Sequence, residues 1–305
     1  MIEKTVVEEI KKMLPSDIIF ENEPMKKHTT FSVGGEAKLY ICIKEISQLQ
    51  QLMSYLTGNK IPYFIIGNGS NLLVSDNGYN GVIIEIGNAF SGVLVENNRI
   101  RAKAGTLLSK VSNYAMKEAL SGIEFASGIP GTIGGAVVMN AGAYDGEMKQ
   151  VVKEVTLLCP DGKIITLSND EMKFGYRFSV IKENPYVVLE VVLELDKKEQ
   201  EEIKKKMEDF SNRRREKQPL EFPSAGSTFK RPKGYYAGKL IMDSDLRGFK
   251  IGGAQVSEKH CGFVINKDNA VAKDIYLLVK EVQMRVKETS GVMLEPEIIF
   301  LGEFE

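Results

Sequence analysis

Three segments of the chain concentrate glycine with small polar residues, a composition that suits phosphate binding. They read TTFSVGG (29–35), GNGSNLLVSD (67–76) and GIPGTIGGAVVMNAGAYDGE (128–147). Glycine lets the backbone approach a ligand closely and point consecutive N–H groups at phosphate oxygens. Because one tight turn would need only one such segment, three of them predict a long ligand that carries a diphosphate.

The standard nucleotide-binding fingerprints are absent from these segments. Leu72 occupies the closing position of the dinucleotide pattern that Gly67 and Gly69 begin. The GKL string at 238–240 lacks the residues of a P-loop. A dinucleotide, if one binds, therefore uses neither standard motif. A single glycine pair is in any case more often an ordinary turn than a phosphate site.

Metal and nucleophilic chemistry find little support in the sequence. The two histidines, His28 and His260, stand in neither an HExxH nor a CxxC context, so no metal site is predicted. No GxSxG elbow is present for a serine nucleophile. Cys261 follows His260 directly, but neighbours on a strand point to opposite faces, which argues against an activated thiol.

Three further polar residues stand in apolar or glycine-rich strings. Arg177 lies in FGYRFS, Ser227 in PSAGSTFK and Glu297 in VMLEPEIIF. Each has a structural explanation of its own: Arg177 as a salt-bridge partner, Ser227 as a turn residue or helix cap, and Glu297 as a charge at a strand edge. Composition alone does not join them into one site.

Taken in order, eight strings resemble those of the UDP-N-acetylenolpyruvoylglucosamine reductase (MurB) family. They are HTTFSVGG, IGNGSNLLVSD, SGIPGTIGGAVVMNAGAYDGE, FGYRFS, RRREKQPLEFPSAGSTFK, AGKLI, GGAQVSEKHCGFVIN and LEPEI. A single glycine string would be weak evidence, whereas eight ordered strings are specific. The short stretch between Tyr176 and Leu195 leaves no room for the extra loop of the longer subtype, so the chain resembles the shorter, type II form.

The resemblance implies an α+β fold, with a two-lobed FAD-binding domain of the vanillyl-alcohol-oxidase-like (PCMH) type and a C-terminal α/β substrate-binding domain. We place the first over 1–198, with lobes at about 1–85 and 86–198, and the second over 199–305, with 199–218 as a connecting helix. The implied activity is the NADPH-dependent reduction of UDP-N-acetylglucosamine enolpyruvate to UDP-N-acetylmuramate in peptidoglycan biosynthesis, with noncovalent FAD as cofactor. A flavin oxidase of the same fold and a non-catalytic sugar-nucleotide-binding protein are the alternatives.

The same resemblance assigns roles to the three polar residues. Arg177 would hold the substrate carboxylate through two hydrogen bonds and stabilise the negative charge that develops there. Ser227 would protonate the adjacent carbon as a general acid. Glu297 would donate a hydrogen bond to the enolate in its neutral form, which its apolar neighbours favour.

Further contacts carry over by position. The implied substrate contacts are Tyr176, Lys230, Arg231, Arg247 and His260. At Arg231 the family's FKNP reads FKRP, so an arginine replaces a substrate-facing asparagine. The implied cofactor contacts are Thr30, Gly34, Gly67, Asn68, Gly69, Ser70, Asn71, Leu72, Gly128, Pro130, Gly131, Thr132, Gly134, Gly135, Asn140, Ala141 and Gly142.

Four helices that would position these strings follow from apolar residues at helical spacing. We predict helices over 6–14, over 44–57 with Gly58 as C-cap, from an N-cap at Thr106 to an end at Gly122, and over 275–286 with Gly291 after its end. The charged stretch 196–218 predicts a solvated helix between domains, because alternating acids dilute its positive charge.

Strands and hairpins follow from short apolar runs and turn residues. We predict strands over 63–66, 82–86 and 186–195. One hairpin over 93–105 turns at Asn97-Asn98, and another over 155–167 turns at Pro160-Asp161-Gly162.

Composition sets the remaining expectations. The chain has 305 residues, 43% of them hydrophobic and 27% charged, which is typical of a globular protein of about two domains. The net charge of −1 (40 − 41) gives no reason to expect a nucleic-acid or membrane partner. Three well-separated cysteines fit a reducing compartment, and the N-terminus lacks a signal peptide. We expect a cytoplasmic monomer.

Overall fold

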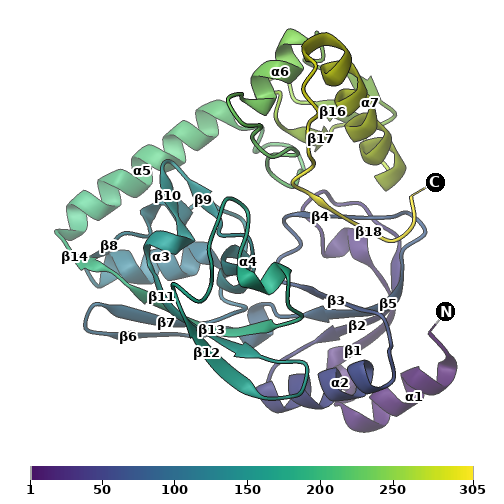
Figure 1. Cartoon of the computed structure of the whole chain (residues 1–305), viewed down its shortest axis with the longest axis vertical. Helices are drawn as coiled ribbons and strands as arrows, with labels where there is room; N and C mark the ends of the chain where they lie inside the picture. The colour runs from purple at the N-terminus through teal and green to yellow at the C-terminus, as the bar shows by residue number, and fades with distance from the viewer. Residues whose placement is uncertain (1, 305) are drawn as a thin grey trace. The chain divides into compact units, whose positions relative to one another are not determined.

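The structure of the chain, a computed structural model, describes residues 2–304 (Figure 1). Contacts within the chain divide it into two units, each of which is described by itself. Unit 1 comprises the N-terminal residues up to Phe20, Leu39–Asn68 and Gly81–Arg214, and unit 2 comprises Glu21–Lys38, Gly69–Asn80 and Arg215 to the C-terminus. Two short strings from the first third of the chain therefore pack with its last third. The division into functional domains at residue 198 stays a prediction.

The first part of the chain forms two helices and a four-stranded sheet. The helices are α1 (Lys4–Met13) and α2 (Ile46–Gly58). The strands lie in the order β1 (Ile19–Pro24), β2 (Glu36–Cys42), β5 (Tyr79–Glu85) and β3 (Tyr63–Ile66), with β3 parallel to β5. Helix α2 buries its apolar stripe, which includes Leu49, Leu52, Met53 and Leu56. The predicted C-cap at Gly58 was wrong: Asn59 ends the helix, and its side chain donates to the Tyr55 carbonyl.

A five-stranded antiparallel sheet forms the centre of the rest of unit 1. Its order is β12 (Ile164–Ser168), β11 (Val152–Leu158), β13 (Val187–Glu194), β7 (Arg99–Lys103) and β6 (Val93–Glu96). Both predicted hairpins are confirmed, with Asn97 at φ 58° and Gly162 at φ 82° in their turns. Strand β13 is buried along most of its length, which explains its near-continuous run of valine and leucine.

The helix predicted after Thr106 begins and ends elsewhere. Helix α3 runs over Leu108–Lys117, and its N-cap residue is Leu107. The Thr106 hydroxyl instead exchanges hydrogen bonds with the backbone N–H and carbonyl of Gly92. The chain leaves α3 through Ala119 at φ 56°, so Gly122 does not end this helix. The cap was mispredicted because Gly92, 14 residues earlier in the chain, occupies the same hydroxyl.

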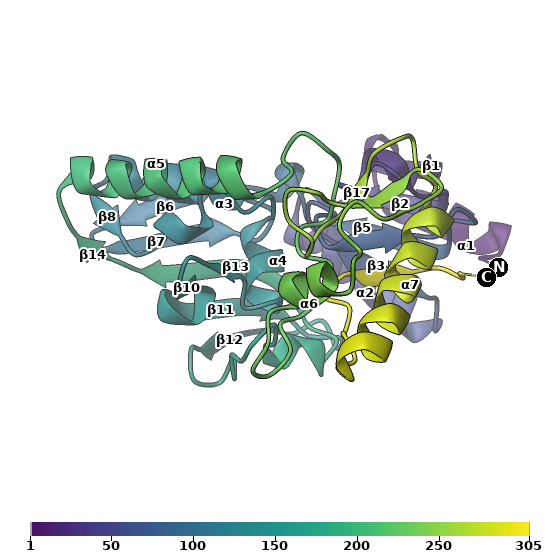
Figure 2. The ribbon, with the colours of Figure 1, turned by 90° about the horizontal axis from the view of Figure 1, so that it is seen from above.

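The charged stretch forms helix α5 (Gln200–Lys217), as predicted, with Ile203 and Phe210 as its buried residues. Figures 1 and 2 show α5 running lengthwise beside α3 and β8 (Leu120–Ser121), which pairs with β14 (Asp196–Lys197). The ring of Phe210 stacks on Tyr144, with 4.5 Å between ring centroids. Tyr144 lies between the short strands β9 (Gly142–Ala143) and β10 (Gly146–Glu147), and helix α4 (Ile133–Val138) precedes them.

Unit 2 contains a second apolar core around a small sheet. Strands β15 (Lys250–Ile251), β16 (Ala254–Val256) and β17 (Val264–Asn266) form this sheet, and helices α6 (Ala237–Asp243) and α7 (Ala272–Ser290) pack with it. Strand β4 (Leu72–Val74) pairs in parallel with β18 (Ile299–Leu301). Helix α7 ends at Gly291 with φ 73°, as predicted. Helices together with several separate, largely antiparallel sheets confirm the α+β class.

Between residues 2 and 304, no helix combines the length and the apolar composition needed to cross a bilayer.

Candidate functional site

Arg177 occupies a tight turn of unit 1. The flanking residues Gly175 and Phe178 exchange two backbone hydrogen bonds, of 3.0 and 3.2 Å, so that Tyr176 and Arg177 form the tip. Arg177 adopts φ 53°, which is uncommon for a residue with a side chain. Its guanidinium lies over the Tyr176 ring, 5.1 Å from the centroid. The turn therefore presents an arginine and an exposed tyrosine together.

Ser227 and Glu297, 70 residues apart in sequence, lie on adjacent segments of unit 2. The N–H of Glu297 donates to the Thr228 carbonyl at 2.8 Å, and the N–H of Lys230 donates to the Glu295 carbonyl at 2.8 Å. Phe229 and Pro296 form the bridge between the two segments. The structure thus places side by side the two segments that carry Ser227 and Glu297, which composition alone did not connect.

Thr228 sets the position of the Ser227 segment. It is fully buried, and its Oγ1 accepts a hydrogen bond of 2.9 Å from the N–H of Val264 on β17. Its own N–H donates to the Gly262 carbonyl at 2.9 Å. All three polar groups of Thr228 therefore have partners, and the exposed Ser227 is held beside the loop that carries His260.

The four predicted substrate contacts of unit 2 each have a partner within the chain. They are Lys230, Arg231, Arg247 and His260. Lys230 pairs with Glu295, and the Arg231 guanidinium lies 4.0 Å from the centroid of the Tyr236 ring. Arg247 donates to the Glu258 carbonyl at 3.0 Å. Burial lowers the pKa of His260, whose Nδ1 accepts from the N–H of Gly262 at 3.1 Å, so its ring is neutral at pH 7. Their contact with substrate stays a prediction.

The first two glycine strings meet within unit 2. The N–H of Thr30 donates to the Gly69 carbonyl at 3.2 Å, and a Cβ at Gly69 would collide with the His28 carbonyl. Asn71 links this region to the predicted catalytic segment, since its side chain donates to the Glu297 carbonyl at 3.1 Å. Ser70 lies between them and is partly exposed.

Leu72 and Gly34 have structural tasks in the same region. Leu72 is buried and pairs with Ile299 in the parallel β4–β18 bridge. Gly34 adopts φ 123°, and a Cβ there would lie 3.0 Å from that of Val74. Ligand contacts at both residues stay predictions, and only the backbone of Leu72 has polar groups to offer.

Two glycine-rich loops meet within unit 1. A Cβ at Gly67 would collide with the Oγ1 of Thr132, and the Asn68 side chain donates to the Pro130 carbonyl at 3.0 Å. Thr132 caps the short helix α4 by accepting from the N–H of Gly135 at 3.3 Å. Gly67 is therefore required for the close approach of one loop to the other.

Other residues of the third string serve packing or turn geometry. A Cβ at Gly134 would lie 2.9 Å from that of Ala104, so this glycine allows α4 to touch strand β7's end. The backbone groups of Gly131, Ala141 and Gly142 bond within the chain, to Ile129, Ala136 and Glu147 respectively. Glycine is therefore enriched in this string both for close packing and for turn geometry, and the sequence pattern does not show which glycine serves which role.

Arg214, which sequence reasoning missed, lies against the third string. A Cβ at Gly128 would stand 3.1 Å from the Arg214 Cδ and 3.2 Å from one of its terminal nitrogens. Burial lowers the pKa of Arg214, and within residues 2–304 no carboxylate forms an ion pair with it. A half-buried guanidinium beside an open glycine backbone suits an anionic ligand. The signal was present in the RRREKQ string, whose charges looked like a solvated face.

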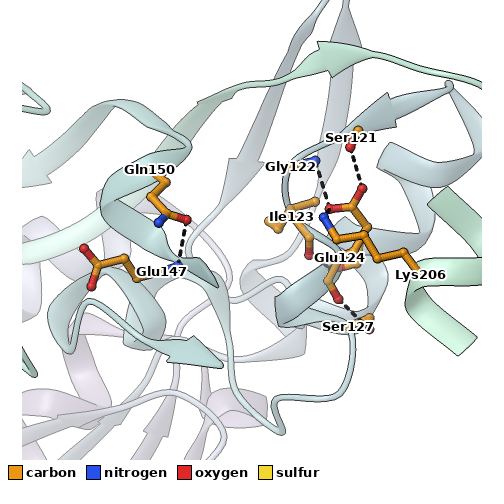
Figure 3. Close-up of polar contacts among 9 residues, drawn as sticks. Ser121, Gly122, Ile123, Glu124, Ser127, Glu147, Gln150 and Lys206 are labelled. Carbon is orange, nitrogen blue, oxygen red and sulfur yellow. Dashed lines mark hydrogen bonds and ion pairs between the residues drawn. The ribbon is translucent and has the colours of Figure 1, made fainter. Parts of the chain in front are cut away.

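Glu124 links helix α5 to the turn at Ser121 and Gly122 in unit 1, as Figure 3 shows. Its carboxylate accepts from the Ser121 hydroxyl at 2.6 Å and the Gly122 N–H at 3.0 Å, and Lys206 of α5 lies 3.3 Å away. Burial acts to raise the pKa of Glu124, but these hydrogen bonds and the lysine outweigh it and hold the pKa below its ordinary value. Figure 3 also shows the bond between Glu147 and Gln150.

Two features test whether these strings fit a cofactor. The Thr30 Oγ1 is buried and has no hydrogen-bond partner within residues 2–304, which calls for a polar ligand atom. Arg214 beside Gly128 offers a positive charge to a phosphate. Across the described chain, no group of three or more histidine, cysteine or acidic residues is arranged to hold a metal ion. The strings therefore fit an anionic organic group.

Comparison with known proteins adds two family matches. Residues 218–301 match the family described as UDP-N-acetylenolpyruvoylglucosamine reductase, C-terminal domain. Residues 37–168 match the family described as FAD binding domain. Together they cover the second and third glycine-rich strings and the Ser227 and Glu297 segments, whereas the first string, 29–35, lies before the matched residues.

Whole-chain relatives agree with these matches. A UDP-N-acetylenolpyruvoylglucosamine reductase from Caldanaerobacter subterraneus subsp. tengcongensis is 51% identical, over 98% of each chain. The crystal structure of the Thermus caldophilus enzyme of the same name aligns with a TM-score of 0.79 at 35% identity, covering 92% of this chain and 97% of that one.

A more distant neighbour shows the fold alone. The glucose dehydrogenase Phl p 4.0202 aligns with a TM-score of 0.51 at 13% identity, covering 65% of this chain and 45% of the other. The predicted FAD-binding architecture is thereby confirmed, together with the match to the FAD binding domain. Because half of its residues are shared over nearly its whole length, this chain belongs to the UDP-N-acetylenolpyruvoylglucosamine reductase family.

Proposed function

We propose that Arg177, Ser227 and Glu297 carry out the reduction of UDP-N-acetylglucosamine enolpyruvate in this chain, with NADPH as the source of reducing equivalents. Family membership makes the chain an FAD-dependent oxidoreductase that reduces this enolpyruvyl sugar nucleotide in peptidoglycan synthesis. The residue roles and the identity of the nicotinamide donor are our assignment.

FAD, when bound, supplies the hydride that adds to the terminal carbon of the enolpyruvyl double bond. The chain's own residues then have to bind that group and the substrate. Thr30 with its orphaned hydroxyl, and Arg214 with the Gly128 backbone, are the candidates to hold FAD's polar atoms.

Arg177 acts on the charge that the addition creates. When the terminal carbon gains a hydride, the electron pair of the double bond moves to the adjacent carbon and into the carboxylate. A guanidinium that holds this carboxylate through two hydrogen bonds stabilises the enolate more than the ground state, because the enolate carries more charge. The turn suits this task, since Arg177 forms its tip together with the exposed Tyr176.

Ser227 and Glu297 complete the reaction from unit 2. The Ser227 hydroxyl gives its proton to the carbon that carries the negative charge, and recovers a proton from water afterwards. Glu297 in its protonated form donates a hydrogen bond to the enolate oxygen, which adds to the effect of Arg177.

One observation carries the assignment of the acid. The segment that bears Ser227 is paired with the segment that bears Glu297 through the Glu297 N–H and the Thr228 carbonyl. Two residues with the required chemistry thus stand on paired segments in the region that matches the reductase's C-terminal domain.

A spectrum and a two-step reduction test the proposal. The purified protein should show the two visible bands of oxidised flavin, released on denaturation. Under anaerobic conditions NADPH should bleach these bands, and the enolpyruvyl sugar nucleotide should restore them. A reduced protein that reacts with oxygen but ignores the enolpyruvyl compound would instead be a flavin oxidase, and a colourless protein would contradict both. Gel filtration tests the expected monomer.

A further inference from the structure

The Arg177 turn cannot hold its shape through its own residues alone. Arg177 sits at φ 53°, where a residue with a side chain is disfavoured, so the surroundings must select this conformation. The carbonyl of Gly175 closes the turn by accepting from the N–H of Phe178 at 3.2 Å. Anything that fixes this carbonyl also fixes the direction in which the turn points.

The Asn140 side chain binds that carbonyl. Its Nδ2 donates to the Gly175 carbonyl at 2.9 Å and to the Glu147 Oε2 at 3.1 Å, while its Oδ1 accepts from the N–H of Lys149 at 2.9 Å. Only one orientation of the amide satisfies all three contacts, because the two acceptors face one end and the donor faces the other. Asn140 is 1% exposed, so its polar atoms are committed to these partners.

A second tether starts from the same segment. The hydroxyl of the fully buried Ser179 donates to the Val138 carbonyl at 2.9 Å. Val138 is the last residue of helix α4 and Asn140 follows two residues later, so both lie in the third glycine-rich string. Gly175 before the arginine and Ser179 after it are therefore both hydrogen-bonded to the third string. The position of Arg177 thus depends on a segment that lies about 35 residues earlier in the chain.

We propose that Asn140 is a positioning residue for Arg177, and that its side chain orients the substrate-carboxylate-binding turn rather than contacting the cofactor. This inference rests on the proposed role of Arg177. An apolar replacement removes the amide, and the turn then samples other directions, so the guanidinium meets the carboxylate less often. The loss should appear in the substrate steps, and it should require the arginine.

A double-mutant cycle with Asn140→Ala and Arg177→Ala tests this, with holoenzyme throughout. We expect Asn140→Ala to lower kcat/KM for the enolpyruvyl substrate by about 10-fold or more, and to weaken binding of the substrate, measured by calorimetry, by a similar factor. The flavin content and visible spectrum should stay as in the unchanged protein. In the Arg177→Ala background the same substitution should change kcat/KM less than about 2-fold.

Asn169→Ala is the matched control, because Asn169 also donates its amide to two backbone carbonyls, those of Lys149 and Val152, but does not contact the turn. It should leave kcat/KM near that of the unchanged protein. If Asn140→Ala does not fold, Ser179→Ala takes its place, since it cuts the second tether and opens almost no cavity.

Several results would overturn the inference. An equal loss in the Arg177→Ala background would show that Asn140 acts independently of the arginine. Loss of FAD from Asn140→Ala would make the residue a cofactor ligand. Full activity of Asn140→Ala beside an inactive Arg177→Ala would refute positioning while leaving the proposed function intact, whereas full activity of Arg177→Ala would refute the proposed function itself.

Discussion

The Arg177 turn of unit 1 and the Ser227 segment of unit 2 are held in different ways. Two backbone hydrogen bonds close the turn, and its direction is fixed by side-chain hydrogen bonds from Asn140 to the Gly175 carbonyl and from Ser179 to the Val138 carbonyl. The Ser227 segment is instead paired through backbone groups with the Glu297 segment on one side and Gly262 on the other. A single substitution can cut a side-chain tether, whereas backbone pairing survives most substitutions.

This difference predicts where each unit is vulnerable. In unit 1 the direction of the Arg177 turn should change when Asn140 or Ser179 loses its polar atoms, because each of these hydrogen bonds depends on one side chain. In unit 2 the position of the Ser227 segment should tolerate changes at exposed side chains, whereas the buried Thr228, which bonds to β17 through its side chain, should resemble the unit 1 tethers.

The largest effect is expected at the reacting groups themselves, where the two units should be equal. Arg177→Ala and Ser227→Ala should each lower the rate of enolpyruvyl reduction by a factor on the order of 100 to 1,000, because each removes a group that acts on the developing charge or its proton. Stopped-flow reoxidation of the reduced flavin by the substrate measures this step directly.

Exposed residues of the same types serve as controls for these variants. Arg99→Ala removes an arginine that pairs with Glu194 on the surface of the sheet, and Ser47→Ala removes an exposed hydroxyl of α2. Both should react at the unchanged rate. A large loss for Arg177→Ala with none for Ser227→Ala would mean that another group, or water, supplies the proton.

A smaller effect, on stability, is expected for Thr228→Val. Valine has nearly the same shape but leaves the N–H of Val264 without an acceptor in the protein interior. A buried donor without a partner costs about 1 to 3 kcal/mol, so the free energy of unfolding in urea should fall by that amount. Thr228→Ser keeps the hydroxyl and should lose about 1 kcal/mol or less. Equal losses for both variants would show that packing, not the hydrogen bond, holds this segment.

Glu124 is a further side-chain tether in unit 1, since its carboxylate bonds both to the turn at Gly122 and to Lys206 of helix α5. Its pKa is lower in the folded protein than in the unfolded chain, so its contribution to stability is complete above pH of about 4.5 and is lost as the pH falls through the folded pKa. Glu124→Gln should therefore lower the free energy of unfolding at pH 7, and the deficit should shrink in acid.

Urea unfolding of both proteins between about pH 3 and 7 measures this difference. Glu118→Gln, which changes an exposed carboxylate nearby, is the control and should show no such trend. A deficit that grew as the pH fell would mean that the folded pKa of Glu124 is raised, opposite to our expectation.

The smallest effect is expected for substitutions of Asp76. They test whether unit 2 depends less than unit 1 on single side-chain hydrogen bonds. Its carboxylate accepts from the N–H groups of Ala272 and Lys273, both at 2.8 Å, and so caps helix α7 from a distant segment. Asp76→Ala should cost about 0.5 to 2 kcal/mol of unfolding free energy, as for other helix caps, without changing the flavin spectrum. Asp76→Asn should recover part of the loss. A larger cost would show that unit 2 also depends on side-chain tethers.

Local patterns predicted much of the fold. The hairpin at Asn97, the strand over Tyr63–Ile66 and the glycine-ended helix α7 all follow from apolar spacing and turn residues near one another in sequence. The cap at Thr106 was wrong because the hydroxyl bonds to Gly92, which no local pattern reveals. Arg214 was missed because its neighbours are charged, and only its place against Gly128 makes it unusual.

The order of its strings was enough to identify this chain's family, because each string keeps residue types that only a particular backbone geometry or ligand would require. Tertiary structure alone decided what individual residues do: that Asn140 bonds to the Arg177 turn, that Glu297 bonds through its N–H to the residue after Ser227, and that Gly134 serves packing. The physical reason is that a hydrogen bond forms between groups that are close in space, and a sequence pattern specifies only those that are close along the chain.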